Sequence, residues 1–138
     1  MIVADTNLIA YLYLESPNSH QAERALLKDA HWAAPLLWRS EFRNVLALYI
    51  RKRWLSLDET QRIMNEALGL MEEQEYEVDS QRVLSLAAES SCSAYDCEFV
   101  ALAQDLGVCL VTLDKQLLSD FPDVAVSLDA FVSAKAQA

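Results

Sequence analysis

The chain opens with Met1-Ile2-Val3-Ala4-Asp5-Thr6-Asn7, in which four apolar residues run directly into a carboxylate. A short run rich in Ile and Val predicts a strand that is buried on both faces of a parallel sheet. Asp5 would then lie at the carboxyl end of that strand, where open α/β sheets bind their ligands. Asp5 or Asn7 could equally cap the helix that follows, and nothing in this stretch alone decides between a binding site and a cap.

Length and composition indicate one compact domain, which we expect to cover residues 1–138. Hydrophobic residues make up 53% of the chain, with two Gly and three Pro, so we expect a well-packed, helix-rich domain without flexible linkers. No apolar run approaches the roughly 20 residues of a membrane span, and no signal-peptide pattern is present. We therefore expect a cytoplasmic protein with no membrane partner. The cysteines, Cys92, Cys97 and Cys109, match no zinc spacing and are expected to be reduced and mostly buried.

The formal net charge of −10 is an argument against a nucleic-acid partner, because it repels phosphates at long range. The basic residues are unevenly distributed, however. Five of the eleven Lys and Arg residues, namely Arg39, Arg43, Arg51, Lys52 and Arg53, fall within fifteen positions. A local basic face is therefore compatible with the acidic chain.

Apolar periodicity and capping residues predict helices that alternate with strands. Ser56 and Glu59 have the spacing of a capping box, and Gly107 is placed to end a helix in the left-handed conformation. The alternation predicts a parallel sheet flanked by helices. Helices are expected over residues 7–15, 20–28, 37–54, 57–73, 80–88 and 94–106, and strands over 1–4, 32–35, 76–78, 108–112 and 124–128.

Three further acids share the placement of Asp5. Glu41 begins an apolar stripe on its predicted helix, and Asp96 does the same on another, so both carboxylates are expected to face inward. Asp114 follows the strand over 108–112, which repeats the arrangement at Asp5. For any one acid, a helix cap or a solvated position is the simpler interpretation, because most acids lie on protein surfaces. As a set they offer hard oxygen ligands, which suit Mg²⁺ or Mn²⁺ rather than zinc. The histidines, His20 and His31, lie in polar surroundings and are expected to face solvent.

Four motifs, in this order, resemble those of the PIN-domain nucleases. Each motif is weak alone, but four at compatible spacing make a specific signal, and in size and order the chain resembles VapC-type toxins of bacterial toxin-antitoxin pairs. The resemblance implies a three-layer α/β/α sandwich with a five-stranded parallel sheet. The motifs are Val3-Ala4-Asp5-Thr6-Asn7, Ser40-Glu41-Phe42 followed by Asn44-Val45-Leu46, Ala94-Tyr95-Asp96 leading into Val100-Ala101-Leu102-Ala103, and Leu110-Val111-Thr112-Leu113-Asp114.

The resemblance also implies an activity, a cofactor and partners. The implied protein is a Mg²⁺- or Mn²⁺-dependent endoribonuclease that leaves a 5′-phosphate and a 3′-hydroxyl, forms a homodimer and is inhibited by a VapB-like antitoxin. Asp5 and Asp96 are expected to ligate a first ion, with Asp114 and Glu41 completing its shell or holding a second ion about 4 Å away. Matching the family's motifs position by position gives the acidic quartet Asp5, Glu41, Asp96 and Asp114, and the supporting positions Thr6, Asn7 and Thr112.

Two sets of residues are expected to contact the partners. Arg39, Arg43 and Lys115 are candidate contacts to RNA phosphates near the acids. An antitoxin would present a basic side chain to the acids and lay an amphipathic segment along the helices over 20–28 and 37–54. The apolar residues that could receive this segment, each of which could instead belong to the core, are Leu26, Leu27, Trp38, Leu48, Tyr49 and Trp54.

Three alternatives to a toxin nuclease are left open by the sequence. A PIN nuclease of RNA processing would use the same acids without a toxin role. A receiver-like phosphoacceptor domain would explain Thr112 and Lys115, but it would need an adjacent acid pair after the first strand and would leave Glu41 and Asp96 unexplained. A non-catalytic module could use the acids to hold a structural metal. Cleavage of RNA with added Mg²⁺ or Mn²⁺ would separate the last two from a nuclease.

Overall fold

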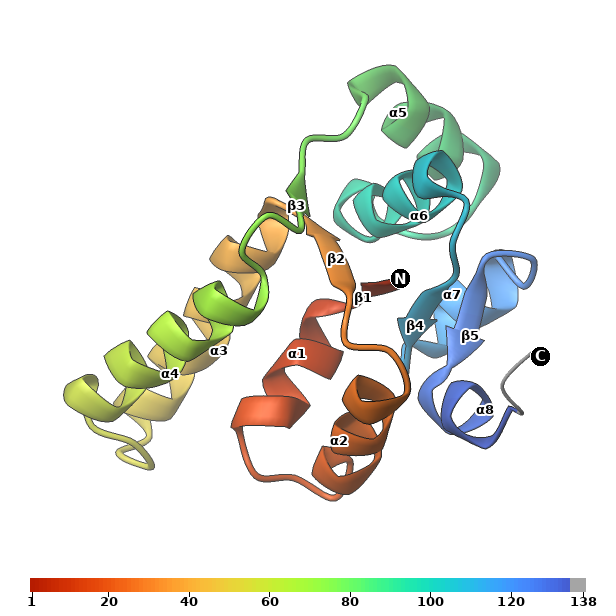
Figure 1. Ribbon diagram of the computed structural model, residues 1–138. Coiled ribbons are helices and arrows are strands. Elements are labelled where there is room, and N and C mark those ends of the chain that lie inside the picture. Colours follow the sequence, from red (N-terminus) through yellow and green to blue (C-terminus); the bar gives the residue numbers. More distant parts are fainter. Residues whose placement is uncertain (135–138) are drawn as a thin grey trace.

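Five parallel strands form one sheet in the computed structural model, which describes residues 1–134 (Figure 1). The order across the sheet is β3-β2-β1-β4-β5, and every pairing is parallel. The predicted α/β fold with a five-stranded parallel sheet is therefore confirmed, while the last four residues of the predicted domain, 135–138, lie outside the described residues. The strands are β1 (Ile2–Ala4), β2 (Trp32–Pro35), β3 (Glu75–Tyr76), β4 (Leu110–Thr112) and β5 (Ala125–Ser127).

Helices flank this sheet in two groups. The chain moves from β1 through β2 to β3 in one direction, then returns from β3 to β4 and β5 in the other. Right-handed crossovers place the helices of these two passes on opposite faces, which gives the three predicted layers. None of the helices within residues 1–134 has the length and apolarity that a membrane span requires. The helices are α1 (Thr6–Tyr13), α2 (Ser19–Lys28), α3 (Leu37–Arg51), α4 (Leu57–Leu70), α5 (Ser80–Glu89), α6 (Ala94–Leu106), α7 (Lys115–Asp120) and α8 (Leu128–Ser133).

Capping residues define where several of these helices begin and end. Ser56 and Glu59 form the predicted capping box, each side chain bonding the other residue's backbone amide. Gly107 ends α6 with a φ of 67°, the left-handed conformation in which glycine has no steric penalty. These local signals are readable from the sequence because they involve only residues within one turn of each other.

Several predicted boundaries were wrong. Helix α3 ends at Arg51 instead of residue 54, because the next residues form a tight turn, and α4 ends at Leu70 instead of 73. The third strand is Glu75–Tyr76 instead of 76–78, since its ladder ends where the amide of Leu36 bonds the carbonyl of Tyr76. Strand β4 starts at Leu110 instead of 108, and the last strand covers 125–127. The short helices α7 and α8 were not predicted.

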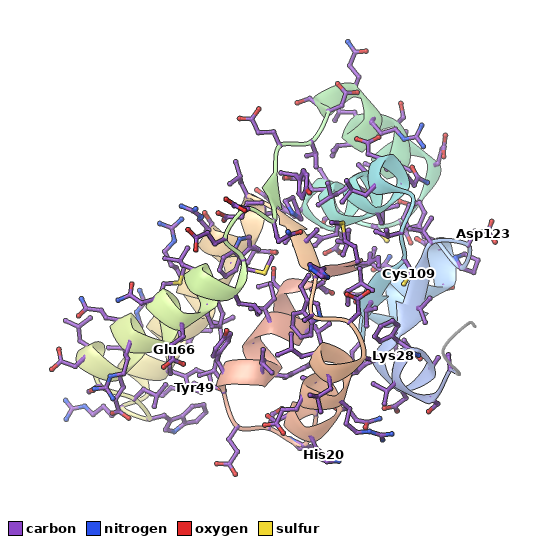
Figure 2. All side chains as sticks on the ribbon, in the orientation of Figure 1. His20, Lys28, Tyr49, Glu66, Cys109 and Asp123 are labelled. Carbon is purple, nitrogen blue, oxygen red and sulfur yellow. The ribbon has the colours of Figure 1, made fainter. Side chains whose placement is uncertain are left out.

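The core is built around large side chains from both faces of the sheet. Trp32 on β2, Trp38 and Phe42 on α3, and Phe99 on α6 are each at most 1% exposed. Two of the cysteines, Cys92 and Cys97, are buried as predicted, and Cys109 is half-buried. The histidines are exposed as predicted, and His20 lies on α2 at the outer end of the molecule (Figure 2).

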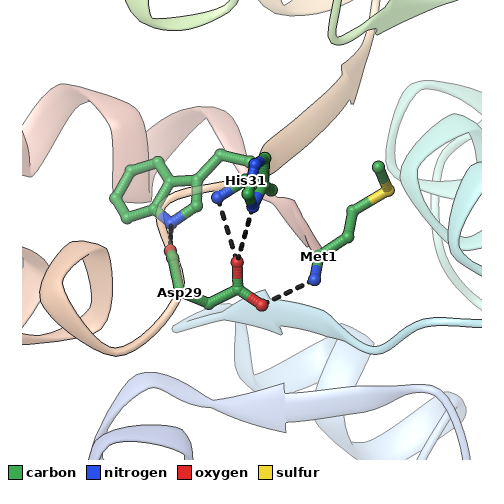
Figure 3. Close-up of polar contacts among 4 residues, drawn as sticks. Met1, Asp29 and His31 are labelled. Carbon is green, nitrogen blue, oxygen red and sulfur yellow. Dashed lines mark hydrogen bonds and ion pairs between the residues drawn. The ribbon is translucent and has the colours of Figure 1, made fainter.

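Asp29 ties the starts of β1 and β2 together at the amino end of the sheet (Figure 3). Its carboxylate accepts hydrogen bonds from the amino group of Met1 at 2.6 Å and from the backbone amide of His31 at 2.9 Å. These bonds, led by the one from the amino group, hold the pKa of Asp29 below its usual range against the opposing effect of burial. The carbonyl of Asp29 also accepts a bond from the indole of Trp32 at 2.8 Å. This cluster lies at the amino ends of the strands, whereas the predicted acids lie at the carboxyl ends.

An ion pair fixes α3 to the edge strand β3. Both guanidinium contacts from Arg39 to the carboxylate of Glu75 measure 2.5 Å, and the indole of Trp38 donates to the same carboxylate at 2.8 Å. These bonds, chiefly those from Arg39, hold the pKa of Glu75 below its usual range. Folding therefore favours the ionised carboxylate. The resulting stability is present above the usual glutamate pKa and disappears as the pH falls through the lowered one.

We expect Glu75→Gln to lower the free energy of unfolding by about 1 kcal/mol at neutral pH, because Arg39 remains partly exposed and water screens the pair. The difference from wild type should shrink as the pH falls below the usual glutamate pKa of about 4.3 and through the lowered pKa of Glu75 in the folded chain. Urea unfolding of both proteins at several pH values measures this difference in stability. Glu77→Gln, two residues along at an exposed position, is the matched control and should change stability little. If Glu75→Gln and Glu77→Gln changed the free energy of unfolding equally at all pH values, the ion pair between Arg39 and Glu75 would have no stabilising role.

Candidate active site

The carboxyl ends of β1 and β4 lie side by side at the point where the chain reverses its direction across the sheet. Ala4 is opposite Val111, and the backbone amide of Asp5 donates to the carbonyl of Val111 at 3.2 Å. Ligands of open α/β sheets bind at such switch points, outside the carboxyl ends of the strands. Asp5 follows β1 directly, and Asp114 follows β4 by two residues. The topology therefore brings these two acids to the same place, at the carboxyl ends of the central strands.

The side chain of Asp5 does not cap α1, although Asp5 occupies the N-cap position. Its Oδ2 instead accepts a hydrogen bond from the hydroxyl of Thr112 at 2.6 Å. Burial raises the pKa of Asp5, opposed by this bond and reinforced by the negative charges of Asp96 and Asp114. The sequence left open whether Asp5 is a cap or a site residue, and the geometry excludes the cap.

Helix α3 brings Glu41 to the same place. Its Oε1 accepts a hydrogen bond from the hydroxyl of Thr6, the first residue of α1, at 2.7 Å. Burial raises the pKa of Glu41, the bond from Thr6 opposes this, and the negative charges of Asp5, Asp96 and Glu98 add to it. The two threonines next to the site thus hold one carboxylate each.

Asp96 lies in the first turn of α6, where the hydroxyl of Ser93 accepts a hydrogen bond from its backbone amide at 3.1 Å. Burial raises the pKa of Asp96, the negative charge of Asp114 raises it further, and a hydrogen bond with the side chain of Ser93 opposes the rise. The partial positive charge at the start of α6 favours a carboxylate there only modestly.

Asp114 is both a cap and a member of the acidic cluster. Its Oδ1 accepts hydrogen bonds from the amides of Gln116 and Leu117, at 2.9 and 3.0 Å, and so begins α7. Both bonds use the same oxygen, so Oδ2 remains available for a ligand. The hydroxyl of Thr112 accepts a bond from the amide of Asp114 at 3.0 Å while donating to Asp5. Thr112 therefore links the two strand-end acids.

The four carboxylates form one electrostatic cluster. Asp114 raises the pKa of Asp5 and Asp96, and Asp5 and Asp96 raise the pKa of Glu41. Such a set of oxygen donors fits a hard divalent cation, which would relieve their mutual repulsion. In the present conformation, no three Asp, Glu, His or Cys side chains of residues 1–134 are arranged to hold an ion. Asp5 and Glu41 are turned toward the threonine hydroxyls, and one oxygen of Asp114 toward α7. Each of these bonds uses one oxygen of its carboxylate, so the second oxygen is available for a cation while the bond is kept.

The other predicted site residues are spread more widely. Asn7 is exposed on α1, and Lys115 is exposed next to Asp114. The guanidinium of Arg39 is occupied by Glu75, and Arg43 donates to the carbonyl of Arg39 at 3.0 Å. Arg43 also lines a cavity of about 250 Å³ between α3 and α4. A contact from Arg39 to RNA would require it to leave Glu75.

The sequence interpretation missed Glu98, whose charge reaches Glu41 and whose pKa is raised by burial. Glu98 also borders a cavity of about 550 Å³ with Leu36, Tyr76 and Val83. It follows Asp96 by two residues, a spacing that places it on another face of an ideal helix, so helical periodicity gave no reason to group them. A second missed residue is Tyr95, 64% exposed, which borders a cavity of about 260 Å³ with Glu41.

Comparison with known proteins identifies this architecture. Residues 2–125 match the model of the PIN domain family. The chain is 32% identical over 124 residues to Ribonuclease VapC3 of Pyrobaculum aerophilum, covering 88% of this chain and 95% of the relative.

Solved structures share the fold at lower identity. The crystal structure of FitAcB from Neisseria gonorrhoeae has a TM-score of 0.72 at 20% identity, covering 92% of this chain and 96% of that one. A toxin-antitoxin complex from Klebsiella pneumoniae has a TM-score of 0.69 at 19% identity, covering 93% and 98%.

The family match sets aside the receiver-like alternative, which in any case left Glu41 and Asp96 without a role. PIN nucleases generally use a divalent metal, in keeping with the oxygen donors assembled here. The resemblance read from the four motifs is confirmed: this chain belongs to the PIN-domain family, as a VapC-type member.

Proposed function

We propose that the protein is a Mg²⁺-dependent endoribonuclease, the toxin of a toxin-antitoxin pair. The observation that carries the proposal is the convergence of Asp5, Glu41, Asp96 and Asp114 at the switch point of the sheet, with Thr6 and Thr112 orienting two of them. The ribonuclease relative, 32% identical over most of both chains, supports RNA as the substrate.

The four acids would hold Mg²⁺, or Mn²⁺ in its place. Bound there, the ion supplies Lewis acidity, a nucleophile at neutral pH and neutralisation of the phosphate charge. The chain's own residues hold the carboxylates in place: Thr112 orients Asp5, Thr6 orients Glu41, and α7 fixes one oxygen of Asp114. The raised pKa values of Asp5, Glu41 and Asp96 mean that protons compete with the ion, so we expect cation affinity to fall as the pH is lowered.

Incubation of the purified protein with total RNA, with and without Mg²⁺ or Mn²⁺, tests this proposal. We expect cleavage only with the metal, and mapping of the cut ends should find 5′-phosphate and 3′-hydroxyl groups. Metal binding without any RNA cleavage would refute the nuclease and favour the non-catalytic alternative.

Thr112→Val should weaken both Mg²⁺ affinity and RNA cleavage by roughly 10- to 100-fold, because Asp5 loses the hydroxyl that orients it. The replacement keeps the shape of this fully buried side chain, so the fold should persist. Calorimetric titration with Mg²⁺ and initial cleavage rates measure the two effects.

Thr60→Val is the matched control, since this buried threonine on α4 bonds the carbonyl of Leu57 and none of the acids. It should leave metal affinity unchanged while costing some stability. If Thr112→Val and Thr60→Val had the same metal affinity as the wild type, Thr112 would have no positioning role.

The proposed protein partner is an antitoxin that blocks the acids with a basic side chain, because an Arg fork can pair with clustered carboxylates. The toxin-antitoxin complex of similar fold supports an antitoxin as the partner. Among the six apolar residues suggested for the antitoxin, Trp38 belongs to the core and Leu26 and Tyr49 are half-buried. Leu27, Leu48 and Trp54 remain exposed at 88%, 45% and 60%, and could contact a partner.

We further propose a cytoplasmic homodimer that slows growth when it is expressed without its antitoxin. Asp5→Ala should be harmless and should still capture the antitoxin. A harmless wild-type protein of confirmed expression would refute the toxin role and favour an RNA-processing nuclease with the same chemistry.

A further inference from the structure

The α3–α4 hairpin extends away from the sheet and ends in a turn, Arg51-Lys52-Arg53-Trp54, which we name the hairpin tip (Figure 1). Three of the chain's eleven Lys and Arg residues are consecutive here, in a chain whose net charge is −10. All four residues of the tip are exposed. Within residues 1–134, none of its three cations forms an ion pair.

Hydrogen bonds hold the tip in a defined conformation. The amide of Trp54 bonds the carbonyl of Tyr49, and the amide of Arg53 bonds the carbonyl of Ile50, each at 3.0 Å. This pair of bonds is the Schellman motif, in which the residue at the position of Arg53 adopts a left-handed conformation and is usually glycine. Arg53 adopts it with a φ of 60°. The chain therefore has an arginine where glycine would be more stable, a feature that local folding does not explain.

An indole ring is presented beside these cations. The rings of Tyr49 and Trp54 meet edge to face with centroids 5.2 Å apart, and the ammonium of Lys52 lies 4.6 Å from the centroid of the Trp54 ring. Tyr49 lies toward the outer end of the hairpin (Figure 2), and its ring packs against the indole. With 60% of Trp54 still exposed, the indole has surface left on which a flat group could stack.

We propose that the hairpin tip binds single-stranded RNA, with Trp54 stacking on a base and Lys52 and Arg53 contacting phosphates; the proposal rests on the ribonuclease function. Cationic side chains beside an exposed aromatic ring are the elements with which proteins bind single strands without sequence preference. Glu41 and Arg51 lie ten residues apart on α3, or about 15 Å along the helix axis. A bound strand of a few nucleotides could therefore reach from the tip to the acids.

The acidic site itself gives a reason for a binding surface at a distance. Its carboxylates repel phosphates wherever a cation does not neutralise them, so a cationic surface elsewhere would add affinity for the RNA strand. The tip is the densest run of cations in the sequence. The nearest acids, Asp58 and Glu59, follow in the first turn of α4, and Glu59 is held in the capping box by Ser56. An acidic protein segment could also meet the cations, and the test below distinguishes it from RNA.

RNA affinity is measured on the full chain carrying Asp5→Asn, so that a short mixed-sequence single-stranded RNA stays intact. Lys52→Gln with Arg53→Gln should weaken binding roughly tenfold and reduce the slope of log affinity against log salt by about 1.4, or 0.7 for each lost phosphate contact. Trp54→Leu should weaken binding roughly tenfold with an unchanged slope, since stacking carries no charge. Arg53→Gly should weaken binding but raise the melting temperature, which separates a loss of contact from a loss of fold.

The matched control is Arg24→Gln with Arg82→Gln, which removes the same charge at exposed positions on α2 and α5. It should change affinity and slope much less than the tip variants do. If the wild-type chain cleaves RNA but the tip and control variants bind it equally, the tip proposal is wrong and the ribonuclease stands. If the tip variants lose a co-expressed antitoxin while keeping RNA affinity, the surface belongs to a protein partner and the proposal is again wrong. A wild-type chain that cleaves no RNA would overturn both proposals.

Discussion

Replacing Asp5 by asparagine should reduce RNA cleavage by about a thousandfold or more. The fold holds Asp5 in place, since its amide is bound to β4 and its carboxylate to Thr112. Stabilisation of the transition state by a correctly held cation is worth several kcal/mol, and each 1.36 kcal/mol is about tenfold in rate. Asparagine has nearly the same shape and can still accept the bond from Thr112, but it lacks the charge that binds the ion.

The same substitution should leave the fold intact or make it more stable. Burial and the charges of Asp96 and Asp114 raise the pKa of Asp5, so folding disfavours its ionised form relative to the unfolded chain. Removing that charge relieves the repulsion. Initial cleavage rates at saturating Mg²⁺, together with thermal unfolding, measure both effects.

Asp105→Asn removes one carboxylate at an exposed position of α6 and is the control for a change in net charge. It should cleave RNA like the wild type. Cleavage by the Asp5 variant at a rate near that of the control would show that the acidic cluster is not the active site.

The parts of the fold that the sequence predicted depend on local or strongly periodic signals. The apolar run before Asp5 and the one before Asp114 became neighbouring strands at the centre of the sheet. Glu41 and Asp96 were expected to face inward because apolar stripes continue from them, and both became partly buried. The family was recognised from four weak motifs in the right order, because hydrophobic periodicity alone does not identify a family.

The parts that were not predicted are contacts between distant residues and short elements with little periodicity. Arg39 faces Glu75, 36 residues away, and nothing in the helix containing Arg39 indicates that partner. Asp114 serves two roles at once, because a strand end and a helix start meet at one residue. The helices α7 and α8 have six residues each, too short for a periodic pattern to separate them from turns.

The end of α3 shows how a local rule can fail. An apolar face that runs from Phe42 to Tyr49, with a break only at Leu55-Ser56, predicted a helix to residue 54. The chain turns at Arg53 instead, without the glycine that usually marks such a turn. The aromatic contact between Tyr49 and Trp54 helps to hold the turn. A position where sequence rules fail in this way is a good place to look for function, and here it led to the proposed RNA surface.

Phe42→Ala should lower the free energy of unfolding by about 3–5 kcal/mol, a large share of the 5–15 kcal/mol typical of a domain. Phe42 is fully buried on α3, and its ring lies 6.0 Å from that of Trp38 and 6.4 Å from that of Tyr13 on α1. The truncation leaves a cavity between the helices that carry Glu41 and Thr6. We therefore expect weaker packing at the point where the bond from Thr6 to Glu41 is made.

Urea unfolding measures the stability, and cleavage rates at low temperature, corrected for the folded fraction, measure the effect on Glu41. The control is Leu48→Ala on the same helix, which removes a side chain that is 45% exposed and should cost less than about 1 kcal/mol. If the folded fraction of Phe42→Ala cleaved RNA at the wild-type rate, Glu41 would be held by Thr6 alone. A further loss of rate in the folded fraction would mean that packing around Phe42 also positions the carboxylate. A cost as small as that of Leu48→Ala would contradict the placement of Phe42 in the core.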